Sequence, residues 1–323
     1  MSEPLYWHLL AHARITPNER MAVLNAAKTL DGDVANLTAW VEGGYPGVAA
    51  DLRDTVLQAF EASAQEAFIL EELEAQGMRV LPGRDPAYPK RFKRALTKRT
   101  PIALYLAGRE ELLNARRTIA IIGSRDASPE ALDTARRAAA FFARQGYVLV
   151  SGNARGIDQT AEESALEAGG EVISVLPQGL LDKATLSLVR KRNHALLEGQ
   201  VALLSELHPK SRWQGRFAMM RNRLIVALAD FVLVAQTGLK ESRSNGKLTQ
   251  SGTWAGAEDA RSLGRRVFVF DLPTDGNLAL ARAFAEPVPL TPNDDMFFAI
   301  EDALKRPTKL VLNATPSVQP KLL

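Results

Sequence analysis

Cysteine is absent from this 323-residue sequence. Its absence excludes a disulfide framework, a thiolate metal site and a cysteine nucleophile. Long apolar runs are absent too, since none approaches the roughly 20 residues that a membrane-spanning helix needs. Residues 1–10 lack the basic segment and apolar run of a signal peptide. We therefore expect a cytoplasmic protein that does not associate with a membrane.

An excess of one charge is also missing, because 40 Lys and Arg stand against 37 Asp and Glu, a net charge of +3. Such a balance is weak evidence for a nucleic-acid partner. The basic residues are nevertheless clustered: residues 84–99 hold seven against one Asp, and residues 210–223 hold five with no acid. Either cluster alone is as compatible with a solvated surface as with a binding site.

Recognisable catalytic motifs are missing as well. The sequence has no G-x-x-x-x-G-K-[ST] loop for nucleotide phosphates and no G-x-S-x-G nucleophile elbow. His8 and His12 share a helix face, but two ligands without a third do not make a zinc site. His194 and His208 are expected to be isolated surface residues. We therefore predict no catalytic residue, no bound metal and no cofactor.

The spacing of apolar residues divides the chain into three parts. Residues 1–77 repeat apolar side chains every three or four positions, which predicts a small helical domain. Residues 78–290 alternate helices with strands that are apolar on both faces, as in a parallel sheet covered on both sides. The predicted fold class is therefore α/β, a Rossmann-like doubly wound parallel sheet with a small helical N-terminal domain. Residues 291–323 are a predicted C-terminal extension with one short helix at 296–304.

Turn and capping residues bound the predicted elements. Ser128 is the predicted N-cap of a helix that has Pro129 in its first turn and stops before Gly146. The segment between the first two strands is predicted to be a basic loop. The strands are predicted at residues 78–81, 103–106, 118–122, 147–150, 172–176, 201–204, 231–234 and 267–270, and the helices at 129–144, 159–168, 186–197, 221–228 and 253–262.

Ligands of an open parallel sheet bind at the carboxyl ends of its strands, near the point where the strand order reverses. Gly123-Ser124-Arg125 follows the strand predicted at 118–122. Gly123 permits a tight turn, the amides after it can hold a phosphate, and Arg125 can pair with one. The dinucleotide fingerprint G-x-G-x-x-G is absent. The alternative is an ordinary turn with a surface arginine.

The loop Ser151-Gly-Asn-Ala-Arg-Gly-Ile-Asp158 follows the next predicted strand. Gly152 and Gly156 frame Arg155, which we expect to point into the cleft. Asp158 is interpreted as a helix cap that pairs with Arg155. The alternative for the whole loop is a capped turn with an internal ion pair.

Two more segments occupy equivalent positions. Arg221-Asn222-Arg223 opens a predicted helix and offers donors to phosphates, whereas the alternative makes Arg223 a structural ion-pair partner. Ser251-Gly252-Thr253 offers hydroxyls and amides to an anion, or is simply an N-cap. Each of the four segments is weak evidence alone. Together they predict a phosphate-binding cleft.

These segments and others resemble the DNA-processing protein A (DprA/Smf) family. Order and spacing match from about residue 78 to residue 275. The loop at 151–158 resembles the most characteristic motif of the family, and Arg221-Asn222-Arg223 lies in a segment like its F-x-x-R-N-R helix. The combination is specific, although no single motif is. The matching segments are Leu81–Pro89, Pro101–Gly108, Ile119–Arg125, Ser151–Asp158, Phe217–Leu228 and Ser251–Thr253.

The resemblance implies that the chain binds single-stranded DNA, forms a homodimer through its Rossmann-like domain and hands the strand to a RecA-type recombinase, as in natural transformation. It also implies that residues 1–77 correspond to the SAM-like helical domain of many members. An aromatic such as Phe217 is the candidate for stacking on a base. The expected nucleic-acid-binding residues are Gly123, Ser124, Arg125, Ser151, Gly152, Arg155, Gly156, Arg212, Arg216, Phe217, Arg221, Asn222, Ser251, Gly252 and Thr253.

The chain also departs from the family pattern. Glu162 stands where the family has a histidine, and Phe217 precedes the Arg-Asn-Arg motif one position early. Residues 240–250 form a long polar stretch, which we interpret as a mobile lid over the bound strand. Nothing after residue 290 is long enough for the winged helix of some members. These differences indicate a divergent member.

The alternative function is a nucleotide-binding sensor or nucleotide-processing enzyme of the related phosphoribohydrolase-like superfamily, for example in phage defence. Those enzymes carry P-G-G-x-G-T-x-x-E, whose glutamate acts at the ribose. The corresponding position here is Gly256, and Glu258 follows two residues later, about 200° around a helix. Glu258 is therefore predicted to face away from the cleft, which argues against hydrolysis but not against nucleotide binding.

Overall fold

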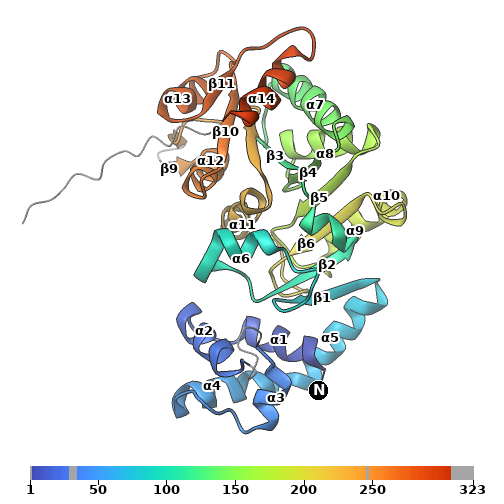
Figure 1. Ribbon diagram of the computed structural model, residues 1–323, viewed down its shortest axis with the longest axis vertical. Helices are drawn as coiled ribbons and strands as arrows, with labels where there is room; N and C mark the ends of the chain where they lie inside the picture. The colour runs from blue at the N-terminus through green and yellow to red at the C-terminus, as the bar shows by residue number, and fades with distance from the viewer. Residues whose placement is uncertain (1, 29–34, 245–246, 307–323) are drawn as a thin grey trace, which may run out of the picture.

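The N-terminal part of the chain is helical, as predicted. The computed structural model describes residues 2–28, 35–244 and 247–306 (Figure 1). Helix α1 begins with a proline in its first turn, and α2 begins at a complete capping box in which Thr16 and Glu19 bond each other's backbone amides. The five helices are α1 (Glu3–His12), α2 (Pro17–Ala26), α3 (Leu37–Glu42), α4 (Ala50–Glu61) and α5 (Ser63–Ala75).

The predicted doubly wound sheet is confirmed. Within the described residues it has nine strands in the order β1-β2-β6-β5-β4-β3-β7-β10-β11. β1 and β2 run antiparallel to their neighbours, and all the other pairs are parallel. The strands are β1 (Met78–Pro82), β2 (Ala103–Gly108), β3 (Thr118–Ile122), β4 (Val148–Ser151), β5 (Glu171–Val175), β6 (Val201–Ser205), β7 (Phe231–Val234), β10 (Arg266–Phe270) and β11 (Glu286–Val288).

The strand order reverses at β3. The chain moves from β3 through β4 and β5 to β6, and then returns to pair β7 on the other side of β3, with Ile119 opposite Phe231. The two crossovers therefore leave in opposite directions from the carboxyl ends of β3 and β7. Loops that diverge in this way leave a crevice between them, which is where open α/β sheets bind ligands.

Helices cover both faces of the sheet, which explains why its strands are apolar on both sides. In β3, Ala120 and Ile122 pack in the cluster under helices α11 (Gly215–Leu228) and α12 (Gly252–Ser262), which lie on one face. Ile119 and Ile121 pack in the opposite cluster under α7 (Pro129–Arg144) and α8 (Ile157–Glu167) (Figure 1). Alternate side chains of one strand thus enter two separate cores.

The capping prediction for α7 is confirmed. Ser128 accepts a hydrogen bond from the amide of Ala131 at 3.2 Å, and Pro129 is the first residue of the helix.

After β10, the remaining described helices are α13 (Asp275–Ala283) and α14 (Asp295–Lys305). Met296, Phe297 and Ile300 of α14 pack in the same core as α7. Residues 307–323 of the predicted C-terminal extension lie outside the described residues.

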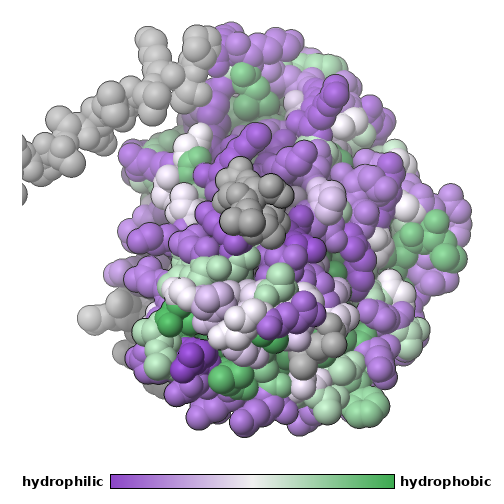
Figure 2. Space-filling view, turned by 60° about the horizontal axis from the view of Figure 1, so that its bottom comes forward, coloured by the Kyte–Doolittle hydropathy of each residue, from purple (hydrophilic) through white to green (hydrophobic). Residues whose placement is uncertain are grey.

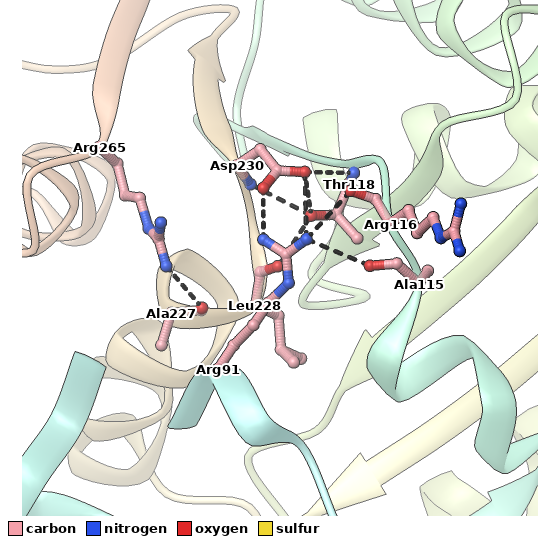
Figure 3. A network of polar contacts seen from close by, with 8 residues as sticks. All are labelled: Arg91, Ala115, Arg116, Thr118, Ala227, Leu228, Asp230 and Arg265. Atoms are coloured by element: carbon pink, nitrogen blue, oxygen red, sulfur yellow. Dashed lines mark hydrogen bonds and ion pairs between the residues drawn. The ribbon is translucent and has the colours of Figure 1, made fainter. Parts of the chain in front are cut away.

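The prediction of a basic loop between β1 and β2 is corrected, because this segment contains helix α6 (Lys90–Leu96) and a short 3-10 turn. Arg91 is half-buried and donates to Asp230, at the amino end of β7, and to the carbonyls of Ala115 and Arg116 (Figure 3). Asp230 also accepts from the amide of Thr118, at 2.8 Å. This part of the basic cluster therefore ties α6 to the amino edge of the sheet.

The helix predicted at 186–197 is also corrected, because it is two helices, α9 (Lys183–Lys191) and α10 (Asn193–Leu197). Arg192 lies between them and turns its guanidinium inward, where it forms a buried ion pair with Glu162 at 2.6 Å. The helix is interrupted at Arg192, a break that the spacing of the apolar residues does not indicate.

The N-terminal helices pack against the antiparallel edge of the sheet. Trp7 and Leu10 of α1 share one apolar cluster with Val80 of β1 and Tyr105 of β2. In the view of Figure 2, hydrophilic residues predominate and apolar ones form separate small groups. Among the described residues, no helix has the length and apolar content needed to cross a membrane. Because α1 shares one apolar cluster with β1 and β2, the helical part and the sheet are joined by a common core and not by a linker alone.

One prediction about the histidines is wrong. His208 is not isolated, because its Nε2 lies 2.9 Å from Oε2 of Glu66 on α5. Glu66 also contacts His8, 58 residues away in the sequence. Contacts between such distant positions depend on how the helices pack, which periodicity alone does not indicate.

Candidate functional site

Two adjoining hollows lie at the carboxyl ends of the central strands. The first, of about 410 Å³, is bounded by the turn after β3, by α11 and by the start of α12. The second, of about 520 Å³, is bounded by the loop after β4, by α9 and by Trp213. Both are lined by Arg125, Ala154 and Arg221, so they share one wall. We call the two hollows together the groove.

Arg221 is the central side chain of this shared wall. It lies in the second turn of α11, which begins at Gly215, and the prediction that it opens the helix is corrected accordingly. The side chain is only 5% exposed. Its guanidinium packs over Gly152, where a Cβ atom would come within 1.2 Å of Nη1. Only glycine at position 152 leaves room for this arginine.

No direct contact with another described residue neutralises the charge of Arg221. Its Nε and Nη1 atoms are buried and have no hydrogen-bond partner among the described residues. Burial lowers the pKa of the guanidinium, and attraction to Asp158 and Glu162 only partly opposes this. Burial in turn raises the pKa of Asp158 to about 6, although attraction to Arg221 lowers it. A buried cation with free donors is an arrangement that an incoming anion stabilises.

Arg155 and Asp158 are not partners, which corrects the predicted pairing. Arg155 is 72% exposed and forms an ion pair with Asp126 at the rim of the second hollow. Asp158 lies in the first turn of α8, where its side chain is buried and interacts with the charge of Arg221 instead. The loop places the two residues three positions apart, and α8 turns Asp158 inward while Arg155 stays outside. Arg155 therefore belongs to the rim and Asp158 to the floor.

The turn after β3 brings its predicted residues into the groove. Gly123, Ser124 and Arg125 all line the first hollow. The amide of Ser124 donates to the carbonyl of Gln236 at 2.8 Å, which joins this turn to the end of β7. The guanidinium of Arg125 lies 5.5 Å from the centre of the Trp213 ring. Arg125 therefore lies between the first hollow and the aromatic surface that lines the second.

Trp213 was missed by the sequence reasoning. It is 49% exposed and lines the second hollow. An exposed tryptophan within a basic run is a signal for nucleic-acid binding, because bases stack on aromatic rings. This signal lies within residues 210–223, where the sequence analysis predicts Phe217 as the base-stacking residue.

Two predicted residues of the loop after β4 do not line the groove. Ser151 is fully buried and donates its hydroxyl to the carbonyl of Ile121 at 2.9 Å. Gly156 has φ of +86°, and a Cβ atom there would approach the carbonyl oxygen of Ser124 to 2.5 Å. Both residues hold the ends of β3 and β4 together. Gly152 does line the second hollow.

A buried network supports this loop from behind. Glu162 accepts from the amide of Asn153 at 2.9 Å and from the hydroxyl of Ser174 at 2.8 Å, and it pairs with Arg192. Asn153 has a positive φ of 51°, which few residues other than glycine adopt. The acid at position 162 therefore fixes the loop conformation through contacts that are complete within this chain.

The start of α12 forms the opposite side of the first hollow. Ser251, Gly252 and Thr253 all line it, and Ser251 accepts from the amide of Trp254 at 3.2 Å, so the N-cap interpretation is confirmed. Asn222 of α11 donates to the carbonyl of Gly252 at 2.9 Å. The positive end of the α12 dipole thus faces the space that Arg221 borders.

Three more predicted residues lie outside the groove. Arg212 borders a separate hollow beside Lys183 and Lys210. Arg216 lies over the ring of Phe217, 4.8 Å from its centre. A ring covered in this way offers one face at most to a base. The binding roles predicted for these three residues stay predictions.

The polar stretch at 240–250 is a two-stranded hairpin, β8 (Glu241–Ser244) and β9 (Lys247–Gln250), whose residues 245–246 lie outside the described part. Gln250 and Gly238, at its base, line the first hollow. Lys240 pairs with Glu258 of α12 at 2.7 Å. The hairpin therefore borders the groove, and its predicted role as a lid stays a prediction.

Comparison with known proteins decides the family. Residues 79–297 match the protein family described as DNA recombination-mediator protein A. The chain belongs to this family. DNA processing protein DprA of Bacillus subtilis (strain 168) is 28% identical over 225 residues, which are 68% of this chain and 71% of that relative. Protein Smf of Escherichia coli (strain K12) is 31% identical over 206 residues, 62% of this chain but only 50% of that relative.

Two solved structures share the fold. DNA processing protein A from Streptococcus pneumoniae superposes with a TM-score of 0.66 at 22% identity, over 91% of this chain and 97% of that chain. The Helicobacter pylori protein, described for its single-stranded DNA binding mode, superposes with a TM-score of 0.54 at 25% identity, over 71% of this chain and 96% of that chain. The predicted resemblance to the DprA/Smf family is therefore confirmed.

Membership in this family does not favour the alternative of a nucleotide enzyme, and neither does the geometry. Gly256 lines the first hollow at the position where the hydrolases have their glutamate. Glu258 lines neither hollow and pairs with Lys240 instead. Arg223 is paired with Glu206, as its structural alternative proposed. The titratable groups that line the two hollows are four cations (Arg125, Arg155, Lys191 and Arg221), the exposed Asp126 and the buried Asp158.

Proposed function

We propose that this chain binds single-stranded DNA in the groove and acts as a recombination mediator. One observation carries the proposal: Arg221 is buried, charged and without a hydrogen-bond partner at Nε and Nη1 among the described residues. A protein gains little from holding such a group unless an anion completes it. The family assignment and the Helicobacter pylori structure make a DNA phosphate the anion of choice.

The groove offers what a single strand needs. Arg221 and Arg125 supply bidentate donors for phosphates, and the amides at the start of α12 add neutral ones. Trp213 supplies a surface for a base. Contacts of this kind give binding that weakens with salt and tolerates sequence changes, because phosphates carry no base code. An aromatic surface beside phosphate-binding arginines favours a nucleic-acid strand over a free phosphate ion as the ligand.

Two finer parts of the proposal follow from the family resemblance. The first is that the chain forms a homodimer through the Rossmann-like domain, which sedimentation of the purified protein tests; a monomer at micromolar concentration contradicts it. The second is that the chain transfers the strand to a RecA-type recombinase in DNA uptake and recombination. Filament growth on a single strand, measured with and without this chain, tests that role; equal rates contradict it.

The binding proposal is tested by fluorescence anisotropy with a labelled oligo-dT of about 35 nucleotides, several times the site of one binding module. The same titration uses a matched duplex and a panel of free nucleotides, each at two salt concentrations. Arg125→Ala tests the groove, and Arg144→Ala is the control because Arg144 is an exposed arginine at the far end of α7.

We expect tight, salt-dependent binding to the single strand, weaker binding to the duplex, and a loss of affinity in Arg125→Ala only. Binding of a free nucleotide without affinity for the oligomer overturns the proposal and makes the groove a small-molecule site. Equal affinities of Arg125→Ala and Arg144→Ala for the oligomer move the binding site elsewhere on the chain.

A further inference from the structure

Three of the chain's four histidines meet where the N-terminal helices contact the sheet. Nε2 of His8, on α1, lies 2.8 Å from Oε2 of Glu66, on α5. Nε2 of His208, in the segment between β6 and α11, lies 2.9 Å from the same oxygen. The ligand-type atoms of these three residues all lie within 4.8 Å of one another. Residues from three separate segments thus converge on one point.

A second layer of groups orients His8. Its Nδ1 lies 2.6 Å from the hydroxyl of Tyr105, which is fully buried, and that hydroxyl lies 2.8 Å from Nε2 of His12. Metal-binding histidines commonly use the second ring nitrogen in this way, since the contact fixes the ring and its tautomer.

The ring positions of the two histidine ligands match a tetrahedral centre. The ring centres of His8 and His208 are 5.3 Å apart. Imidazoles bound to one zinc ion at about 2.0–2.1 Å have centres about 5 Å apart, because each centre lies about 3 Å from the ion along directions near the tetrahedral angle. The two nitrogen-to-oxygen distances need to grow by only about 0.5 Å to fit around such an ion.

Nitrogen ligands select the metal class. Two imidazoles with one carboxylate suit zinc and similar transition-metal ions, whereas calcium and magnesium prefer oxygen ligands. Two histidines and a glutamate leave a fourth position open. Water is the candidate for that position, because Nε2 of His12 already contacts the hydroxyl of Tyr105.

We propose that His8, Glu66 and His208 bind one divalent transition-metal ion, zinc by ligand type, which clamps the N-terminal helices to the sheet. The ion displaces the two imidazole-to-carboxylate hydrogen bonds, and the ring protons of His8 and His208 move to Nδ1. In His8 the moved proton is donated to Tyr105. Without a metal, Nδ1 of His208 accepts from the amide of Lys210 at 3.2 Å. A proton on Nδ1 removes this contact, which lowers the affinity for the metal.

The clamp also has a consequence for the groove. His208 lies in the segment that leads through Trp213 to α11, and the amide of Leu181 bonds the carbonyl of Pro209 at 2.8 Å. An ion at His208 would therefore hold the start of the segment that carries the aromatic wall. This coupling provides a route from metal occupancy to the rigidity of the groove.

The test uses the untagged full chain, stripped with a chelator and dialysed against zinc. Bound metal is measured by mass spectrometry, thermal unfolding is followed with and without zinc, and cobalt loading reports tetrahedral geometry through its visible spectrum. Glu66→Gln and His208→Gln remove ligands without emptying the core, because Gln is isosteric with Glu and His208 is 27% exposed. His194→Gln, on α10, is the matched control.

We expect one zinc per chain and a higher unfolding temperature with zinc in the wild type and in His194→Gln. Both effects should disappear in Glu66→Gln and in His208→Gln, which should keep their metal-free unfolding temperatures close to that of the wild type. No zinc retained by the wild type after dialysis overturns the proposal. Zinc retained equally by the two ligand variants overturns it as well, because the ion then binds elsewhere.

Discussion

Replacing Arg221 with methionine separates its binding role from a structural role. Methionine keeps most of the buried apolar length and removes the charge. Hydrogen bonds to a charged group contribute about 1.5–3 kcal/mol each, and Nε and Nη1 are both without partners before DNA arrives. Taking about 3 kcal/mol for the pair, we expect affinity for a single strand to fall by about 100-fold, since each 1.4 kcal/mol is a factor of ten.

The stability of the free protein should change little in this variant. Removing the guanidinium breaks no hydrogen bond at Nε or Nη1 and removes a buried charge, which offsets the packing that is lost. Asp158 loses the attraction that lowers its pKa, so its pKa rises further and the carboxyl group takes up a proton more readily. We expect the free energy of unfolding to stay within about 1 kcal/mol of the wild type.

Affinity measured against salt concentration, together with urea unfolding, distinguishes a binding role of Arg221 from a structural role. Loss of one phosphate contact should reduce the slope of log affinity against log salt by about 0.7 for a single strand. Arg144→Ala, with an exposed side chain, should leave the slope unchanged. Arg221 is a structural residue, and the reasoning fails, if Arg221→Met unfolds readily or keeps its affinity to within threefold.

Gly152→Ala reaches the same arginine without changing a charge. The new methyl group would lie 1.2 Å from Nη1 of Arg221, so the guanidinium has to move out of its place. We expect the affinity for single-stranded DNA to fall in the same direction as in Arg221→Met while net charge stays constant. Wild-type affinity in Gly152→Ala would mean that the position of Arg221 does not matter for binding.

Three further predictions concern the groove. Because the pKa of Asp158 is raised to about 6, protonation removes a negative charge as the pH falls, so affinity should rise severalfold from about pH 7.5 to about pH 5, and Asp158→Asn should lack this added dependence; an identical pH profile in the variant contradicts the assignment. Asp126→Asn frees Arg155 from an exposed ion pair, so strand affinity at low salt should increase about two- to threefold, and a decrease would show that the pair orders the rim. Replacing residues 241–250 by a short glycine linker should speed dissociation of the strand in stopped-flow, whereas an unchanged rate leaves the hairpin a passive element.

Local pattern was sufficient to predict the fold and the edge of the sheet at which the groove lies. Strands that are apolar on both faces require two helical layers, and the alternation of Ile121 and Ile122 between two cores is the tertiary form of that rule. The glycine and arginine motifs at strand ends were placed at the reversal of strand order, because parallel strands bring all their carboxyl ends to one edge. Period and punctuation are properties of neighbouring residues, so they can be read from the sequence.

Which of the groove and basic-run arginines has an ion-pair partner was decided only by the tertiary structure. Arg155 and Arg221 look alike in the sequence, yet Asp126, 29 residues away, pairs with the first, and burial over Gly152 isolates the second. Arg91, in an equally basic run, is occupied by Asp230, 139 residues away.

The histidine cluster shows the same limit at longer range. His8, Glu66 and His208 have no common motif and meet only because α1, α5 and the segment after β6 pack together. The sequence by itself therefore determined the layers of the fold and the edge of the sheet at which the groove lies. The availability of each side chain was decided by partners that only the folded chain brings within a few ångströms.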